Sequence, residues 1–192
     1  MKVLVACEFS GIVREAFKAK GCDAWSCDLL DTEIPGQHIK GDVLDVLGNG
    51  WDLMIAHPPC RYLSYAGNVW MKQPGRKENR EVAMGFFMAL ANAPIGKICI
   101  ENPPGYPRKA WRLPDQIIHP YHFGHPIRKA TCLWLKGLPL LTHPEVDAPL
   151  PCYIDGVTGR NRHWVDTLSP KNRAKNRSRT FQGIADAMAD QW

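Results

Sequence analysis

Two residues able to perform covalent and acid–base chemistry follow short apolar runs in the sequence. Cys60 comes after Leu53–Ala56 in the segment His57-Pro-Pro-Cys60, and Glu101 follows Lys97–Ile100 and precedes two further prolines. Each apolar run predicts a buried strand, and the prolines end its hydrogen-bonded ladder and fix the loop that follows. A thiol held on such a loop is a candidate nucleophile, while the structural alternative is a small buried hydrophobe, which most free cysteines are.

The rest of the chain alternates strands with helices. Apolar runs predict strands at Lys2–Cys7, Asp23–Asp28, Ile39–Val43, Asp52–Ala56, Lys97–Ile100, Ile117–Phe123 and Thr131–Lys136, and helical spacing predicts helices at Gly11–Lys20, Asn79–Ala91 and Phe181–Trp192. This order predicts an α/β fold with a mostly parallel sheet and an antiparallel strand near the end. Because parallel strand tips share one edge of the sheet, Cys60 and Glu101 are expected to lie near each other.

The first strand, helix and second strand have the outline of a nucleotide-binding unit. Ser10 is the expected helix N-cap, Gly11 forms the turn, and Asp28 ends the second strand, where an acid can accept hydrogen bonds from ribose hydroxyls. The sequence has neither a full Gly-x-Gly-x-x-Gly motif nor a phosphate-cradling lysine motif. A dinucleotide or ATP is therefore poorly supported.

A family resemblance rests on two ordered motifs. Pro59-Cys60, with Leu63-Ser64-x-Ala66-Gly67 after it and Glu101-Asn102 later, resembles the cytosine-5 DNA methyltransferases. In that family the nucleophile motif is Pro-Cys-Gln with a nearby Ser-x-Ala-Gly, and the next strand ends in Glu-Asn-Val. The resemblance covers about residues 3 to 136 and the final helix. It implies a Rossmann-like fold that uses S-adenosylmethionine as methyl donor.

The resemblance also implies roles for individual residues. Phe9-Ser10-Gly11 is similar to the cofactor loop of the family, Asp28 to its ribose-binding acid, and Gly41-Asp42-Val43 to its adenine-contacting segment. Phe123-Gly124-x-Pro126, with Arg128 or Lys129 after it, resembles a later motif. The implied residues are Cys60, Glu101 and Arg128 for catalysis, Phe9, Ser10, Gly11, Asp28, Asp42 and Pro58 for the cofactor, and Ser64, Asn102 and Lys129 for the substrate.

The chain departs from the family in its loops and in its size. Val13, Arg61, Pro103 and Ile127 replace a glycine, a glutamine, a valine and a second glutamine of the family pattern. Residues 1–192 form one expected domain, in which the irregular basic segment 137–180 takes the place of a separate target-recognition domain. Within it, the run from Lys171 to Arg179 holds five basic residues and no acid, as expected for an anionic partner or for a solvated loop.

The implied reaction is methylation of cytosine in DNA at carbon 5. The Cys60 thiolate adds to ring carbon 6, and Glu101 neutralises charge at ring nitrogen 3, so we expect a dry pocket to raise the pKa of Glu101. The alternatives are the same chemistry on a free pyrimidine nucleotide, and a non-catalytic nucleic-acid-binding relative. An amino-directed methyltransferase is disfavoured because His57-Pro-Pro-Cys60 and Asn102-Pro-Pro-Gly105 lack the stacking aromatic residue of such enzymes, and no spacing marks His57 or His125 as the base of a cysteine hydrolase.

The composition also indicates the class of protein and its compartment. The 192 residues are 45% hydrophobic and 22% charged, with a net charge of +5, which is typical of a globular protein with a sizeable core. The seven cysteines show no Cys-x-x-Cys pair, so we expect no metal, no disulfide framework, and a reducing, cytoplasmic setting. No apolar segment approaches the roughly 18 residues of a membrane span. The sequence does not indicate an oligomeric state.

Overall fold

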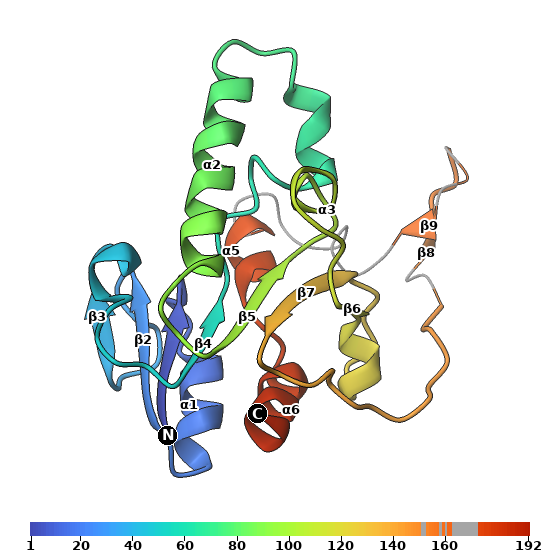
Figure 1. The fold of residues 1–192 in the computed structure, drawn as a ribbon. Coiled ribbons are helices and arrows are strands. Elements are labelled where there is room, and N and C mark those ends of the chain that lie inside the picture. Colours follow the sequence, from blue (N-terminus) through green and yellow to red (C-terminus); the bar gives the residue numbers. More distant parts are fainter. Residues whose placement is uncertain (151–152, 158, 160, 163–172) are drawn as a thin grey trace.

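The fold is built on one mixed β-sheet, seen in the computed structural model (Figure 1). The structure describes residues 1–150, 153–157, 159, 161–162 and 173–192. Within these residues, seven strands form one sheet in the order β3-β2-β1-β4-β5-β7-β6, and β8 pairs with β9 in a separate two-stranded ribbon. The strands are β1 (Lys2–Ala6), β2 (Asp23–Asp28), β3 (His38–Lys40), β4 (Leu53–Ala56), β5 (Lys97–Asn102), β6 (Gln116–Ile118), β7 (Thr131–Lys136), β8 (Tyr153–Ile154) and β9 (Asn161–Arg162).

The sheet is mostly parallel, as the alternating sequence pattern predicted. Strands β1 to β5 pair in parallel, whereas β7 lies antiparallel between β5 and β6. The expected antiparallel strand near the end of the chain is thus confirmed. Strand order changes direction at β1, where β2 lies on one side and β4 on the other. Ligands of open α/β sheets bind at such a switch point, beyond the carboxyl ends of the strands.

Burial and register fix which strand tips meet. All four residues of β4 are buried, as expected for a central parallel strand covered on both faces. Ala6 of β1 is paired with Ala56 of β4, and Ala56 is paired in turn with Ile100 of β5. Strands β1 and β4 therefore end at one level, whereas β5 continues past it to Asn102. As a result, Cys7 and His57, which follow β1 and β4, lie level with Glu101 of β5 at one edge of the sheet.

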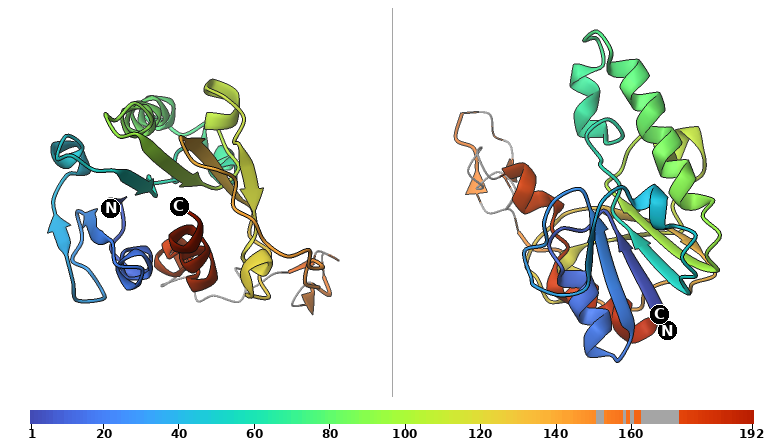
Figure 2. Two further views of the ribbon diagram at one scale, coloured as in Figure 1. Left: turned by 60° about the horizontal axis from the view of Figure 1, so that its bottom comes forward. Right: turned by 90° about the vertical axis from the view of Figure 1, so that its left-hand side faces the viewer.

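Helices cover both faces of the sheet (Figure 2). The helical elements are α1 (Ile12–Ala19), η1 (Val43–Val46), η2 (Tyr65–Trp70), α2 (Arg76–Ala91), α3 (Pro107–Ala110), η3 (Pro120–Phe123), α5 (Arg173–Ser178) and α6 (Gln182–Gln191). On one face α1 and α6 pack against strand residues such as Val3 and Val5. On the other, Phe87 of α2 packs against Leu4 and Met54. The core is thus two apolar layers separated by the sheet.

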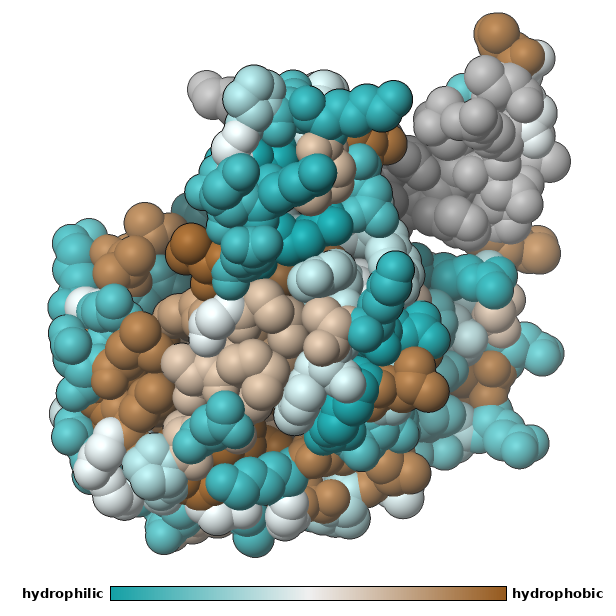
Figure 3. Space-filling view, turned by 45° about the horizontal axis from the view of Figure 1, so that its top comes forward, coloured by the Kyte–Doolittle hydropathy of each residue, from teal (hydrophilic) through white to brown (hydrophobic). Residues whose placement is uncertain are grey.

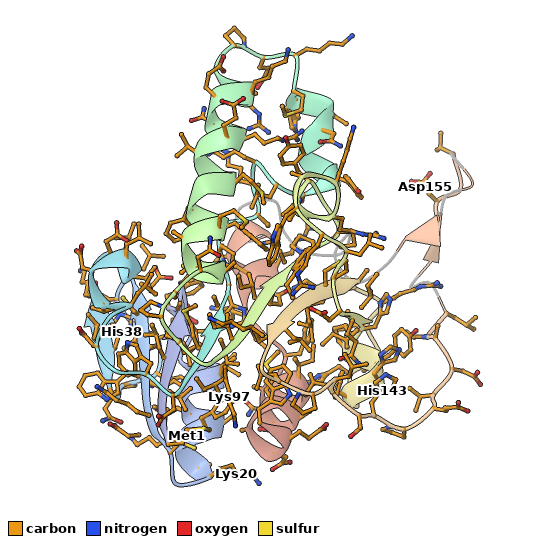
Figure 4. All side chains as sticks on the ribbon, in the orientation of Figure 1. Met1, Lys20, His38, Lys97, His143 and Asp155 are labelled. Carbon is orange, nitrogen blue, oxygen red and sulfur yellow. The ribbon has the colours of Figure 1, made fainter. Side chains whose placement is uncertain are left out.

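The two helices on the first face are also joined at their ends. Lys20, which follows α1, forms an ion pair with Asp190 of α6, and Figure 4 shows Lys20 at the lower end of the molecule. On the opposite side of the fold, α2 projects beyond the sheet (Figure 1), and the surface over it is mostly hydrophilic (Figure 3). The apolar stripe of α2 was visible in the sequence only from Asn79, because the helix begins with the charged residues Arg76, Lys77 and Glu78.

Three predicted strands differ in extent by more than one residue. The strand predicted at Lys97–Ile100 continues to Asn102, so Glu101 lies within β5 and not after it. The segment Ile117–Phe123 is a strand only to Ile118, because Pro120 has no N–H to donate to a ladder and instead begins η3. Similarly, β3 covers His38–Lys40, and the Asp42 carboxylate accepts a hydrogen bond from the Leu44 N–H and caps η1. The final predicted helix is confirmed as α6.

The segment 137–180 is only partly described. Residues 138–150 contain neither helix nor strand, in agreement with the irregular segment expected there. The ribbon β8–β9 and helix α5 were not predicted. The predicted basic run begins at Lys171, which lies outside the described residues, but its later part forms α5 and the turn that follows it. The assignment of residues 1–192 to a single domain stays a prediction.

Candidate active site

The carboxyl ends of β1, β2 and β4 surround a cavity of about 240 Å³. Its lining combines the loop after β1, the end of β2, the tip of β4 and the segment after α5, and consists of Cys7, Glu8, Phe9, Ser10, Asp28, Leu30, His57, Pro59, Ser178 and Thr180. Three predicted cofactor residues, Phe9, Ser10 and Asp28, are therefore brought together. The cavity lies where the strand order predicts a ligand.

The loop between β1 and α1 is held by Glu8, a residue for which the sequence predicted no role. Its buried carboxylate accepts hydrogen bonds from the N–H groups of Val13 at 2.7 Å and Arg14 at 3.2 Å, and from the Ser10 hydroxyl at 3.1 Å. The carboxylate thus caps α1 together with the predicted cap, Ser10, whose hydroxyl accepts a hydrogen bond from the Ile12 N–H at 3.3 Å. Because a protein carboxylate already occupies this helix N-terminus, a ligand phosphate has no place there.

Gly11 makes this loop possible. Its φ angle of 78° lies in the left-handed region, which favours glycine. A Cβ atom at Gly11 would stand 2.7 Å from the Arg14 guanidinium. Gly11 therefore has a structural role in the loop between β1 and α1 and is not itself part of the cavity lining.

Arg14 is a second functional residue that sequence reasoning missed. The side chain is fully buried, and its guanidinium donates hydrogen bonds to Glu15 (2.8 Å), Ser26 (2.9 Å), Thr32 (3.1 Å) and the Ile34 carbonyl (2.6 Å). It thereby ties α1 to β2 and to the loop after β2, which contributes Leu30 to the cavity. Helical periodicity cannot find it, because a charged residue on a helix is normally assigned to the solvent face.

Two proline loops at the tips of β4 and β5 are joined to each other. Asn102 is buried and its side-chain amide donates to the Pro58 carbonyl at 2.8 Å. Further along, Ser64 and Gly105 form an isolated β-bridge, and a Cβ at Gly105 would clash with the Leu63 carbonyl oxygen. Cys60 is thus carried on a loop that is fastened at both ends to the loop following Glu101.

The projecting helix α2 supports the same loop from outside. Arg80 donates to the Tyr62 carbonyl at 2.9 Å and to the Asn68 side chain at 2.6 Å. Arg76 is buried and lies over the Tyr62 ring, with its guanidinium carbon 4.6 Å from the ring centroid. These contacts explain why the Cys60 loop is followed by a helix that extends beyond the sheet.

Cys60 and Glu101 are close enough to influence each other. Cys60 is exposed overall, but the protein atoms around its thiol displace water, and this desolvation raises the Cys60 pKa. The negative charge of Glu101 raises the Cys60 pKa further, while the positive charges of Lys129 and Arg177 oppose the increase. Cys60 and Glu101 therefore lie close together, as expected. The raised pKa keeps Cys60 a protonated thiol at neutral pH in the free protein.

Glu101 differs from the expectation for an acid in a dry pocket. Burial raises its pKa, but the hydrogen bond from His57 and the charge of Lys129 outweigh this, so the net effect lowers the pKa of Glu101. The His57 Nδ1 atom lies 3.1 Å from the Glu101 Oε2 atom. The expectation of a raised pKa is therefore wrong for the free protein, because it considered burial without the neighbouring imidazole and ammonium groups.

The sequence did not decide between Arg128 and Lys129 as the basic residue of the site, and the structure separates the two. Lys129 lines a small hollow together with Glu101, Thr131 and Arg179, and its ammonium group donates to the Arg177 carbonyl at 2.9 Å. Arg128 is exposed, and its charge acts on His119. Lys129 therefore faces the Cys60–Glu101 pair, and the structure does not bring Arg128 to it.

The remaining predicted residues surround the site without lining the cavity. Asp42 caps η1 and is exposed, and Pro58 is buried and accepts the Asn102 hydrogen bond. Ser64 begins η2 and lies in the bridge to Gly105. In the structure these residues hold loops, so a direct contact with cofactor or substrate stays a prediction for them.

The basic run near the end of the chain reaches the cavity. Arg179 binds the Glu33 carboxylate with two hydrogen bonds of 2.9 and 2.8 Å, and Lys175 lies 2.7 Å from the same carboxylate. Because Glu33 belongs to the loop after β2, these contacts bring Ser178 and Thr180 against the cavity. They also lower the pKa of Glu33 to about 2, first through the hydrogen bond from Arg179.

Sequence comparisons identify no relative: no protein-family model matches the chain, and no curated protein matches it. Comparison with solved structures does find a similar fold. A candidate DNA modification methyltransferase encoded within a prophage of E. coli aligns with a TM-score of 0.52 and 14% identity, over 78% of this chain and 52% of that chain. The chain has a Rossmann-like methyltransferase fold. It spans about half the length of that protein.

A second solved structure, WbdD with a bound kinase inhibitor, aligns with a TM-score of 0.41 and 14% identity, over 92% of this chain and 47% of that chain. That score is too low to inform the fold. Among the described residues, no group of three or more His, Cys, Asp or Glu side chains is placed to hold a metal ion. Nor do the described helices include one with the length and apolar character needed to cross a bilayer.

Proposed function

We propose that the chain is an S-adenosylmethionine-dependent methyltransferase that acts on carbon 5 of cytosine in DNA through a covalent Cys60 adduct assisted by Glu101. The observation that carries the proposal is the placement of Cys60 and Glu101 on neighbouring segments that are joined to each other, in a methyltransferase fold. The same edge holds the cavity that Phe9, Ser10 and Asp28 line. A site for the methyl donor and a nucleophile are therefore both proposed at the same edge of the sheet.

The cavity residues fit S-adenosylmethionine in chemical type. The Asp28 carboxylate is an acceptor for ribose hydroxyls, the Phe9 ring offers an apolar face, and Glu8 and Asp28 give the cavity an acidic character that suits a sulfonium cation. The capped N-terminus of α1 suits a ligand without phosphate groups. When bound, the cofactor supplies an electrophilic methyl group to the pyrimidine.

The charge states of Cys60 and Glu101 define the first proton transfer. In the free protein, Cys60 is a thiol and Glu101 a carboxylate, so the pair holds one proton. We infer that the thiol proton passes to Glu101 and from there to ring nitrogen 3, while the Cys60 sulfur forms a bond to ring carbon 6. The ring gains one proton and one sulfur–carbon bond, and Glu101 returns to the carboxylate.

The release step reverses these movements. Once carbon 5 carries the methyl group, it loses its proton to water, and the electron pair of that bond re-forms the ring double bond as the sulfur–carbon bond breaks. The Cys60 thiolate then recovers the proton from nitrogen 3 through Glu101. Lys129 is suited to stabilise the thiolate, because its positive charge already opposes the rise in the Cys60 pKa.

DNA is the proposed polymer because cations surround the Cys60 side of the site. Lys129, Arg177 and Arg179 lie near the pair, and Arg61 follows the nucleophile directly. A base in a duplex must leave the stack to reach Cys60, which costs a few kcal/mol, so single-stranded or mismatched DNA is expected to react faster. Phosphate contacts by these cations would make binding fall steeply with salt concentration.

The test is incubation with labelled S-adenosylmethionine and separate pools of duplex DNA, single-stranded DNA, RNA and pyrimidine nucleotides, followed by nucleoside mass analysis. We expect 5-methylcytosine in a DNA pool. Methylation of free nucleotides alone, insensitive to salt, would favour the nucleotide alternative. Absence of both transfer and calorimetric heat of cofactor binding would favour a non-catalytic nucleic-acid-binding protein.

Two substitutions test the assigned chemistry. Cys60→Ser and Glu101→Gln are expected to lower methyl transfer by at least about a thousandfold, because each removes one member of a pair that acts as a unit. Cys22→Ser and Glu78→Gln are the matched controls, and both are expected to keep wild-type activity. Near wild-type transfer by either site variant would refute the mechanism.

A further inference from the structure

His57 is a buried imidazole beside the proposed acid–base residue. It follows β4 directly, and the pairing of Ala56 with Ile100 puts it level with Glu101. Its side chain is only 7% exposed, and its Nδ1 atom lies 3.1 Å from the Glu101 Oε2 atom. His57 also lines the cavity that is proposed to hold the cofactor. It therefore stands between the two halves of the site.

The second ring nitrogen indicates which tautomer is present. The Nε2 atom of His57 is buried and has no hydrogen-bond partner among the described residues. A proton on this atom would be a buried donor without an acceptor, which is costly, whereas a bare lone pair costs less. The geometry thus places a proton on Nδ1, donated to the carboxylate of Glu101.

We propose that His57 is a positioning residue for Glu101: its Nδ1–H donates to one carboxylate oxygen, fixes the orientation of the group and leaves the other oxygen for the pyrimidine. The inference rests on the proposed function where it assigns Glu101 to proton transfer, but the His57–Glu101 contact stands on geometry alone. A hydrogen bond to the charged form favours that form, so His57 also keeps Glu101 ready to accept the Cys60 proton.

Other titratable groups surround Glu101, and they set the background for any test. Cys60 faces it from the β4 loop, Cys99 from β5 and Cys132 from β7, and all three have raised pKa values. Lys129 and Arg179 line the hollow that Glu101 shares. Since the cysteines stay protonated over the acid range, a change in the titration of Glu101 after substitution of His57 is assigned to the lost contact with His57.

A pair of variants separates positioning from packing. His57→Phe keeps a buried ring but has no donor, whereas His57→Asn is smaller but retains a side-chain N–H. The direct measurement is a carbon-13 NMR titration of glutamate-labelled protein, with the Glu101 carboxyl signal assigned by its loss in Glu101→Gln. We expect the Glu101 midpoint to move to higher pH by about one unit in His57→Phe and to return most of the way in His57→Asn.

The control is His143→Phe, which alters a histidine outside the site and is expected to leave the Glu101 midpoint unchanged. Equal midpoints in wild type and a folded His57→Phe would overturn the proposal. Should His57→Phe fail to fold, His57→Gln versus His57→Leu gives the same comparison. This titration does not use activity, so it decides the role of His57 even where the methylation assay fails.

Activity provides a second measurement on the same variants. In His57→Phe we expect kcat to fall at least about tenfold at pH 6 with little change in KM, and the acid limb of the pH profile to move upward. His57→Asn is expected to recover most of kcat. A pH profile with an unmoved acid limb, despite lower kcat, would mean that His57 acts by packing alone and would overturn the positioning role.

Discussion

Arg14 offers the sharpest test of how the fold holds its cavity. The guanidinium is fully buried and donates to groups on α1, β2 and the loop after β2. In Arg14→Met the apolar stem remains, but every one of these donors is lost. The loop that carries Leu30 to the cavity then has no charged anchor on α1, and the Ser26 hydroxyl loses its Arg14 donor inside the protein.

The size of the effect follows from the exposure of the partners. Removing one partner of a buried charged network costs roughly 3–5 kcal/mol. Ser26 is buried, but Thr32 is only half-buried and Ile34 is exposed, so water can replace the donor at these two. We therefore place the loss in the free energy of unfolding at the lower limit, about 3 kcal/mol.

The measurement is urea unfolding followed by circular dichroism, with amide hydrogen exchange to locate the change. Lys40→Ala is the matched control, because Lys40 pairs with Asp31 next to the same loop but at 58% and 82% side-chain exposure. An exposed pair of this kind contributes less than about 1 kcal/mol. A loss below about 1 kcal/mol in Arg14→Met, or unchanged exchange in residues 29–37, would refute the role of Arg14 as the anchor.

Two further substitutions test the loops around the site. Gly105→Ala puts a Cβ against the Leu63 carbonyl oxygen and should lower the free energy of unfolding by about 2 kcal/mol or more in a urea titration. The control Gly85→Ala, within α2 and in open space, should raise it by about 0.5–1 kcal/mol, and equal effects would contradict the close approach of the two loops. Glu33 has a pKa of about 2 in the folded protein against an ordinary 4.5, so its contribution is complete above pH 4.5 and is lost as the pH falls toward 2. Glu33→Gln should therefore flatten the pH dependence of stability in that range, and a wild-type slope would show that Arg179 and Lys175 do not stabilise the fold through Glu33.

The sheet was predictable because its strands carry their own signals. Leu53–Ala56 and Lys97–Ile100 are short apolar runs ended by polar residues, and the rule that parallel strand tips share an edge was enough to bring Cys60 to Glu101. The strand predicted at Ile117–Phe123 was too long, because its apolar residues favour a strand but Pro120 has no N–H to continue the ladder. Local composition thus predicts that a strand is present, but not where it ends when one missing backbone N–H sets the boundary.

The polar framework of the site was not predictable, because it depends on which charged side chains the fold buries. Glu8 and Arg14 look like ordinary loop and helix residues in the sequence, and only the packing of α1 against β2 makes one a helix cap and the other an anchor. His57 did carry a signal, since it precedes the prolines at the end of a predicted strand. The register that levels it with Glu101 was needed before that signal had meaning.

The pKa of Cys60 is raised and that of Glu101 is lowered, and the two shifts fit one mechanism. In the proposed mechanism, the Glu101 charge helps to keep Cys60 a protonated thiol until the pyrimidine binds. The proton that Glu101 passes to ring nitrogen 3 comes from that thiol, so a pyrimidine able to accept it at this position draws the proton away from sulfur. Recognition of the ring and activation of the thiol are then one event. A ring with no hydrogen-bonding nitrogen at that position would leave Glu101 charged, and Cys60 would stay protonated beside it.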